Sequence, residues 1–339
     1  MNRKINPASL EGKLIDIHSH AGVHLKAYIC AEYPYACSIE TIACHQKMAG
    51  VDVNVVFPFS ADLFFDSLYL KKGICRPSVR SVSPSPYAIE NQLLLREVYE
   101  FCPEYSGRFL PFISIDPGRS VAKQIKNILM LEKRYPIYGI KISPVICQSR
   151  ITALLGEGRD FLDLVREKNW PLLLHTTVHK EEKYSNAAMA FEVIEKNQDI
   201  RFCLAHCIGF HDRYLRLADM MKNVWVDTAA LKIQVQMARE NSPIVAGKRE
   251  RFKADYRDHR ATMKALAEEF PDTIIWGTDA PAYSYICRRK QADGVYMDFV
   301  LKARYEDEIA ALNSLPDRLK VNLSNHNSIK FIFGSEAKR

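Results

Sequence analysis

The sequence predicts an α/β protein whose fold is a (β/α)8 TIM barrel with extended loops at the C-terminal face. Three observations lead to this fold. Short apolar segments alternate with amphipathic helical segments along the chain, which is typical of a parallel sheet. These segments are apolar at nearly every position, as strands buried on both faces are. A chain of 339 residues is also long enough for one such barrel.

The predicted strands are short runs rich in Ile, Leu, Val and Phe. They are expected at residues 14–19, 53–58, 109–115, 137–142, 171–175, 201–206, 223–227 and 273–278. Apolar residues at three-to-four spacing predict helices between the strands. These are expected at residues 120–135, 161–168, 187–197, 257–270 and 298–312, with a terminal helix at 324–333 that Gly334 ends.

An open, doubly wound sheet is the alternative fold. Such a sheet usually carries a glycine-rich phosphate-binding turn after its first strand, where this chain has His18-Ser19-His20 instead. We expect one domain over residues 1–339, with the barrel at about 14–334. The connections 59–87 and 228–256 are longer than a barrel needs, so we expect them to form a lid and to select the substrate.

The amino-acid composition and charge argue against several classes of protein. Hydrophobic residues make up 47% and charged residues 26% of the chain, and the formal charge is +7. Basic residues are dispersed without a basic, aromatic-rich face, which argues against nucleic-acid binding, while the mild positive bias suits an anionic substrate such as a carboxylate. The nine cysteines follow no disulfide framework, and no segment is a signal peptide or membrane span. We therefore expect a reduced, cytoplasmic protein that acts on a small molecule, with self-association left open.

Chemically active side chains end five of the predicted strands. His18 and His20 lie on one face of the first strand, because side chains at i and i+2 of a strand point the same way. Later strands end in Lys141, His175 and His206, and Asp279 follows the last strand. The carboxyl ends of parallel barrel strands share one rim, so these side chains are expected to converge there.

The chain resembles the amidohydrolase superfamily, most closely the branch that includes non-oxidative aromatic decarboxylases, lactonases and uncharacterised amidohydrolases. The resemblance covers nearly the whole chain, since each matching motif lies on a different predicted strand. The motifs are Leu14-Ile-Asp-Ile-His-Ser-His20, Gly139-Ile-Lys-Ile-Ser-Pro144, Leu174-His175, Ala205-His206-Cys-Ile-Gly209 and Gly277-Thr-Asp279-Ala-Pro281.

This resemblance implies a divalent metal site. Imidazole and carboxylate ligands suit zinc, with Mn²⁺ or another divalent ion as alternatives, and the expected ligands are His18, His20, His175 and Asp279. Such a metal would activate a water molecule, whose proton Asp279 would accept as general base and pass to the leaving group. His206 would hold the water or the developing oxyanion by hydrogen bonding.

Lys141 decides between one and two metals. In some relatives a carboxylated lysine at this strand bridges two metals, and His206 then binds the second ion. The same sequence context occurs in relatives with a single metal and no bridging lysine. One Zn²⁺ is the favoured expectation, with two metals if Lys141 is carboxylated.

Other residues are candidates for contact with substrate. His24 follows His20 closely, and His179 follows the fifth strand. Arg80, Arg150 and Arg288 lie on loops that could reach the rim, where arginine would clamp a carboxylate with two hydrogen bonds.

The favoured function is therefore a metal-dependent hydrolase that cleaves a small amide, lactone or ester. The first alternative is a metal-dependent, non-oxidative decarboxylase of an aromatic or unsaturated acid, which needs the same ligands. The second is a barrel that binds ligand without turning it over.

Overall fold

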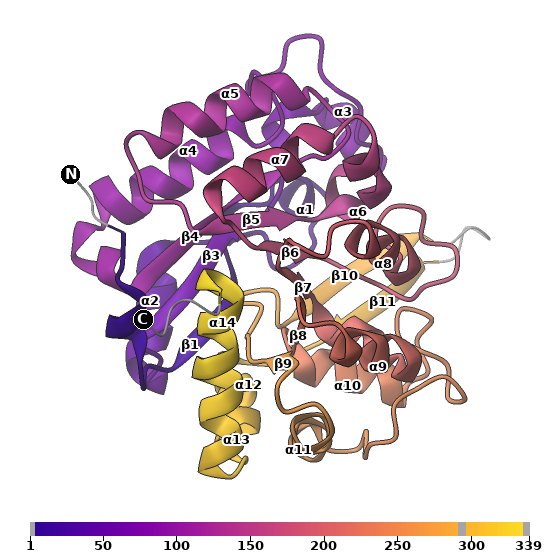
Figure 1. Cartoon of the computed structure of the whole chain (residues 1–339). Coiled ribbons are helices and arrows are strands. Elements are labelled where there is room, and N and C mark those ends of the chain that lie inside the picture. The colour runs from indigo at the N-terminus through magenta and orange to yellow at the C-terminus, as the bar shows by residue number, and fades with distance from the viewer. Residues whose placement is uncertain (1–3, 291–295, 335–339) are drawn as a thin grey trace.

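A single curled sheet organises the computed structural model, which describes residues 4–290 and 296–334 (Figure 1). The strand order is β2-β1-β3-β4-β5-β6-β7-β8-β9, and all pairs are parallel except the short β1–β2 pair. The bounds are β1 (Ile15–Val23), β2 (Ala36–Cys37), β3 (Val53–Pro58), β4 (Phe109–Ile115), β5 (Gly139–Ile142), β6 (Leu172–Leu174), β7 (Phe202–Leu204), β8 (Val224–Asp227) and β9 (Ile274–Ile275). All eight predicted strands are confirmed, as β1 and β3 to β9.

Most of the helices lie on the outer side of the sheet (Figure 1). Their bounds are α1 (Leu25–Ile29), α2 (Ile39–Ala49), α3 (Ser67–Leu70), α4 (Ala88–Arg96), α5 (Val121–Glu132), α6 (Pro144–Cys147), α7 (Arg159–Lys168), α8 (Ala187–Glu195), α9 (Asp212–Met220), α10 (Leu231–Arg239), α11 (His259–Glu269), α12 (Tyr305–Asn313), α13 (Asp317–Val321) and α14 (Asn327–Phe333). The helices predicted at 120–135, 161–168, 187–197 and 257–270 are confirmed. So is the terminal helix, which starts as a π-helical turn and ends at Gly334 with a φ of 87°.

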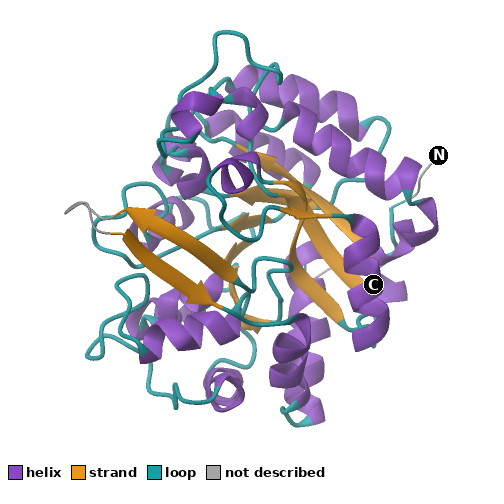
Figure 2. Ribbon diagram, turned by 180° about the vertical axis from the view of Figure 1, so that it is seen from behind, coloured by secondary structure: helices purple, strands orange, loops and turns teal. Residues whose placement is uncertain are grey.

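The helix predicted at 298–312 is wrong in its first part. Residues up to Leu301 belong to a β-hairpin formed by β10 (Tyr285–Lys290) and β11 (Tyr296–Leu301), and α12 begins only at Tyr305 (Figure 2). Cross-strand pairs such as Cys287 with Phe299 hold the hairpin. This pairing between two neighbouring segments overrides the helix expected for residues 298–301.

The two long connections differ in structure. Residues 59–87 contain only the short α3 and one 3₁₀ turn, in agreement with a long loop. Residues 228–256 form a long connection that contains the nine-residue helix α10. Among the described residues no helix is long and apolar enough to cross a membrane.

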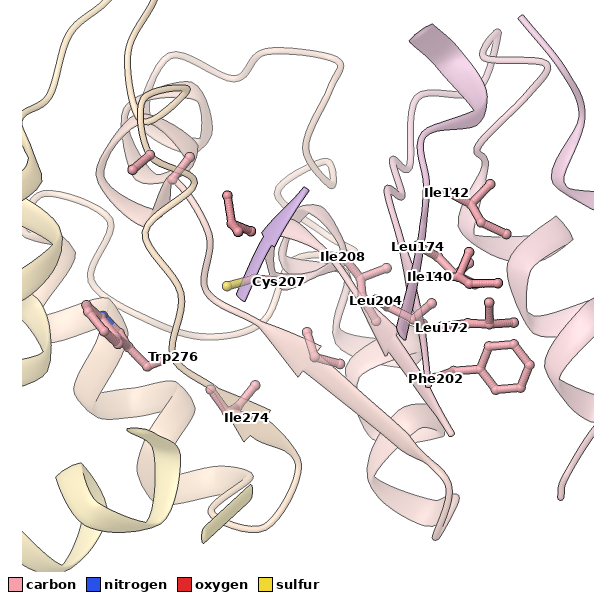
Figure 3. Packing of buried hydrophobic residues seen from close by; sticks show 14 of the residues in the cluster. Ile140, Ile142, Leu172, Leu174, Phe202, Leu204, Cys207, Ile208, Ile274 and Trp276 are labelled. Atoms are coloured by element: carbon pink, nitrogen blue, oxygen red, sulfur yellow. The ribbon is translucent and has the colours of Figure 1, made fainter. Parts of the chain in front are cut away.

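The sheet buries apolar side chains on both of its faces. Outward-facing residues from neighbouring strands form rows that pack under the helices, and Figure 3 shows Ile140, Leu172 and Phe202 in one such row with Ile142, Leu174 and Leu204 in the next. These six side chains are fully buried. Alternation along each strand sends the intervening residues to the other face.

A second apolar cluster fills the inner side of the sheet. It contains residues from β1, β3, β4, β6, β7, β8 and β9, together with Phe331 and Ile332 of α14. A flat sheet would hold the first and last of these strands far apart, so a shared cluster requires strong curvature. The curvature brings the segment after β9 beside β1, where Asp279 N donates to His18 O at 2.8 Å and His20 N donates to Ala280 O at 2.6 Å.

Candidate active site

The predicted side chains meet at the carboxyl ends of the strands. His18 and His20 lie on β1 and Lys141 on β5, while His175 and His206 directly follow β6 and β7. Asp279 follows β9 and lies beside β1 through the backbone bonds described above. Residues separated by up to 261 positions along the chain therefore share one rim.

Three of these residues offer ligand atoms to a common point. One ligand atom from each of His18, His206 and Asp279 lies within 4.8 Å of the other two. Asp279 Oδ1 is 3.3 Å from His18 Nε2 and 3.1 Å from His20 Nε2, so His20 adjoins the group through the same oxygen. Asp279 Oδ2 lies 3.8 Å from His206 Nδ1.

His175 joins the group through His206. His175 Nδ1 and His206 Nε2 are 3.0 Å apart, and His206 Nδ1 is 3.1 Å from the carbonyl oxygen of Ala229. A carbonyl only accepts, so the proton on His206 lies at Nδ1 and His175 Nδ1–H donates to His206 Nε2. This assignment leaves the Nε2 lone pair of His175 free to bind a ligand.

Lys141 lies at the centre of the site rather than at its edge. Its side chain is 1% exposed, and its Nζ is 3.1 Å from His18 Nε2 and 4.6 Å from the ring centroid of Phe57. The amine therefore touches both an expected metal ligand and an aromatic face.

Burial dominates the electrostatics of these groups. Burial lowers the pKa of Lys141 to about 8, and it holds the pKa values of His18 and His175 well below their usual range. Burial alone would raise the pKa of Asp279, but the adjacent histidines outweigh it and hold that pKa at about 2. Neutral imidazole and ionised carboxylate are the forms that bind a divalent metal, and the lowered pKa values of these histidines and of Asp279 favour both.

The surroundings of Asp279 Oδ1 show whether these residues fit a metal ion. Asp279 Oδ1 is buried, faces two imidazole nitrogens, and has no hydrogen-bond donor among the described residues. An ionised oxygen held in this way is costly unless a positive charge lies next to it. A divalent cation held by His18, His20 and Asp279 would satisfy it, so these donors fit the ion that the sequence predicts.

Sequence reasoning missed two buried carboxylates beside His18. Asp227, the last residue of β8, lies with its Oδ2 2.7 Å from His18 Nδ1 and its Oδ1 2.8 Å from His206 N. Asp16 accepts hydrogen bonds from the backbone N–H of His18 and from the hydroxyl of Thr278. A carboxylate at the end of a predicted strand was the available signal for Asp227.

The candidate substrate residues lie in three different places. His24 adjoins the site, because its ring stacks on Phe59, which in turn stacks on His20 with ring centroids 4.9 Å apart. His179 lines a cleft of about 610 Å³ together with His211. Arg80 and Arg150 are exposed on the surface, and Arg288 forms a 3.5 Å ion pair with Asp298 on the exposed hairpin.

A left-handed turn presents His206. Residues His206–Phe210 all have positive φ, from 48° at Ile208 to 62° at His206. This conformation costs an L-residue about 1–2 kcal/mol, and it is especially unusual for a β-branched residue such as Ile208. Strained backbone of this kind gathers at functional sites, where the surrounding packing holds it.

Comparison with known families gives one match of wide extent. The family model described as amidohydrolase matches residues 79–331, which is well over half of the chain. Comparison with curated proteins gives no match.

Solved structures with the same fold are distant in sequence. An amidohydrolase from Burkholderia multivorans with bound zinc has a TM-score of 0.58 at 10% identity, covering 95% of this chain and 99% of its own. An uncharacterised TIM-barrel protein from Bordetella bronchiseptica has a TM-score of 0.57 at 12% identity, with 96% and 100% coverage. The IDCase of Metarhizium anisopliae has a TM-score of 0.55 at 10% identity, with 99% and 100% coverage. At these identities the likeness extends to the fold alone.

Proposed function

The chain belongs to the amidohydrolase family, and from that premise we propose that it is a metal-dependent hydrolase of a small amide, lactone or ester. One observation carries the proposal. The buried Asp279 Oδ1 has no hydrogen-bond donor among the described residues, yet it lies within 3.3 Å of the ring nitrogens of His18 and His20. A carboxylate arranged in this way suits both a metal ligand and a proton acceptor.

The expected ligands are His18, His20, His175 and Asp279, with His206 beside them. A divalent cation held by these donors supplies a Lewis acid and lowers the pKa of water near it. A zinc-containing amidohydrolase of the same fold supports Zn²⁺ as the ion. One ion is favoured, with a second if Lys141 becomes carboxylated.

The chain's own residues handle the proton and the developing charge. Asp279 is ionised, because its pKa of about 2 lies far below neutrality, so it can accept the proton of the attacking water and return it to the leaving group. His206 lies 3.8 Å from Asp279 Oδ2 and can steady the water or the oxyanion. Lys141 adds positive charge beside them, which suits an anionic substrate.

A closed (β/α)8 barrel over about residues 14–334 is part of the proposal. The backbone hydrogen bonds between β1 and residues 276–280 support it, as does the continuous inner apolar cluster. The loop at 59–87 would then shape substrate access, since Phe59 lies between His20 and His24.

The proposal is tested with metal-stripped and zinc-reloaded protein on a panel of small amides, lactones and esters. Reloading should restore hydrolysis, and oxygen-18 from water should enter the product. Elemental analysis of the loaded protein should give one zinc per chain, and two per chain would contradict the single-metal arrangement.

Asp279→Asn should reduce turnover by about 10²–10⁴-fold, because a general base contributes a factor of that size. Asp199→Asn is a matched control, since Asp199 is an exposed carboxylate paired with Arg166. Full turnover in Asp279→Asn would contradict the assignment of the base. Metal-dependent release of carbon dioxide without uptake of water oxygen would contradict a hydrolase.

A further inference from the structure

Asp227 contacts two of the metal-site histidines at once. It is fully buried at the end of β8, and its Oδ2 lies 2.7 Å from His18 Nδ1. Its Oδ1 accepts hydrogen bonds from the backbone N–H groups of His206 and Ala229, at 2.8 and 3.0 Å. One carboxylate therefore ties β1 to the turn that follows β7.

The pattern of donors around Asp227 specifies which nitrogen of His18 carries hydrogen. The two backbone N–H groups donate to Asp227 Oδ1. An ionised carboxylate has no hydrogen to donate, so its 2.7 Å contact with His18 Nδ1 requires the hydrogen to lie on that nitrogen. A neutral imidazole then keeps its lone pair on Nε2. His18 Nε2 faces the Lys141 amine at 3.1 Å and Asp279 Oδ1 at 3.3 Å, so that lone pair points into the donor cluster.

We propose that Asp227 is a positioning residue that holds His18 in its Nδ1–H tautomer and so presents the Nε2 lone pair to the metal. The same carboxylate also fixes the backbone of His206, which follows the neighbouring strand. Partners of this kind orient a ligating imidazole and raise its basicity, and their loss typically weakens metal binding by about 10–100-fold. The inference rests on the proposed metal site.

Asp16 provides a matched control. It is also fully buried and also bonds to His18, but through the backbone N–H at 3.0 Å rather than through the ring. Substitution of Asp16 therefore disturbs a buried carboxylate next to the same residue without changing which ring nitrogen is bonded.

The test measures the tautomer directly in metal-free protein labelled with ¹⁵N-histidine. Long-range ¹H–¹⁵N spectra distinguish protonated from unprotonated ring nitrogens, and a His18→Gln variant assigns the His18 signals. The wild type should show Nδ1–H at His18. In Asp227→Asn the side-chain amide can donate to Nδ1, so His18 should change to Nε2–H and zinc affinity should fall by about 10–100-fold.

Asp16→Asn should keep His18 in the Nδ1–H form. The proposal is overturned by an Nε2–H tautomer in the wild type, which would mean that a protonated Asp227 donates to the ring. It is equally overturned by unchanged zinc affinity in Asp227→Asn. The wild-type spectrum decides the tautomer even where a variant does not fold. None of these measurements requires turnover, so failure of the proposed function is seen separately.

Discussion

At the residue scale, burial raises the pKa of an acid and lowers the pKa of a base unless a neighbouring charge compensates. Lys141 has no carboxylate in hydrogen-bonding contact among the described residues, and burial lowers its pKa to about 8. Asp279 lies against three histidines, which outweigh burial and hold its pKa at about 2. The same buried rim can therefore keep one group ionised and make another easy to deprotonate.

Glu90 shows the effect of burial without such compensation. Burial raises the pKa of this carboxyl to about 7, and only its Oε1 is bonded, to Leu63 N at 3.1 Å. Below about pH 4.5 the folded and unfolded states are both protonated. As pH rises from 4.5 to 7 the unfolded state releases its proton first, so the free energy of unfolding should fall. The loss should reach about 3 kcal/mol, because one pKa unit corresponds to about 1.4 kcal/mol.

Glu90→Gln removes this titration. The free energy of unfolding of the variant, relative to that of the wild type, should therefore be higher at pH 8 than at pH 4.5. Urea unfolding at pH 5 and pH 8 measures the difference. Glu11→Gln, at an exposed position, is the control and should track the wild type at both values. Parallel curves for Glu90→Gln and wild type would show that Glu90 is ionised in the folded protein.

The convergence of the site residues could be predicted for those side chains that lie at the ends of predicted strands. His18, His20, His206 and Asp279 were found because the ends of parallel strands share a rim, so their convergence follows from topology. The contact between Asp227 and His18 could not be predicted in this way. His18 lies 209 positions earlier in the chain, and the register that brings the two together is set by the curvature of the whole sheet.

At the element scale, the turn His206–Phe210 depends on close packing. A Cβ on Gly209, whose φ is 56°, would lie 2.9 Å from Val178 Cγ2 and 3.2 Å from Ile244 O. Gly50 ends α2 with a φ of 71°, but a Cβ there would meet nothing within 4 Å. The two glycines share the backbone conformation and differ in the space around them.

Gly50→Ala should therefore lower the free energy of unfolding by about 1 kcal/mol, because the only penalty is the positive φ of the backbone. Gly209→Ala should cost about 1–3 kcal/mol more, because the added methyl overfills a packed site. It should also weaken zinc binding, since relief of the clash moves the turn that carries His206. Urea unfolding and zinc titration of both variants measure these effects, and equal losses in the two would show that packing around Gly209 is loose.

Most elements could be predicted from the apolar pattern of their own residues, but one pair of strands could not. Strands and most helices followed from apolar spacing. The hairpin β10–β11 did not, because only three residues separate β11 from α12 and residues 298–312 taken together predict one helix. Only the pairing of Phe299 and Leu301 with Cys287 and Tyr285 decides in favour of strand.

At the scale of the whole molecule, the candidate site and a large part of the stabilising apolar packing lie at opposite ends of the strands. The donors lie at the carboxyl ends of the strands, and α14 packs against the opposite ends. Phe331 of α14 is fully buried in the inner cluster, with ring centroids 6.3 Å from Phe112 and 5.9 Å from Trp225. Phe333, two residues later, is only partly buried and contacts the Tyr138 ring at 6.2 Å.

Phe331→Ala should lower the free energy of unfolding by about 3–5 kcal/mol, because it opens a cavity that the surrounding strands cannot collapse into. Phe333→Ala should cost clearly less, since its ring already meets solvent. At a temperature where Phe331→Ala remains folded, its zinc affinity should equal that of the wild type, because no donor contacts α14. Urea unfolding and zinc titration check both parts. A Phe331→Ala protein that is stable but binds zinc weakly would show that the two ends of the strands are mechanically coupled.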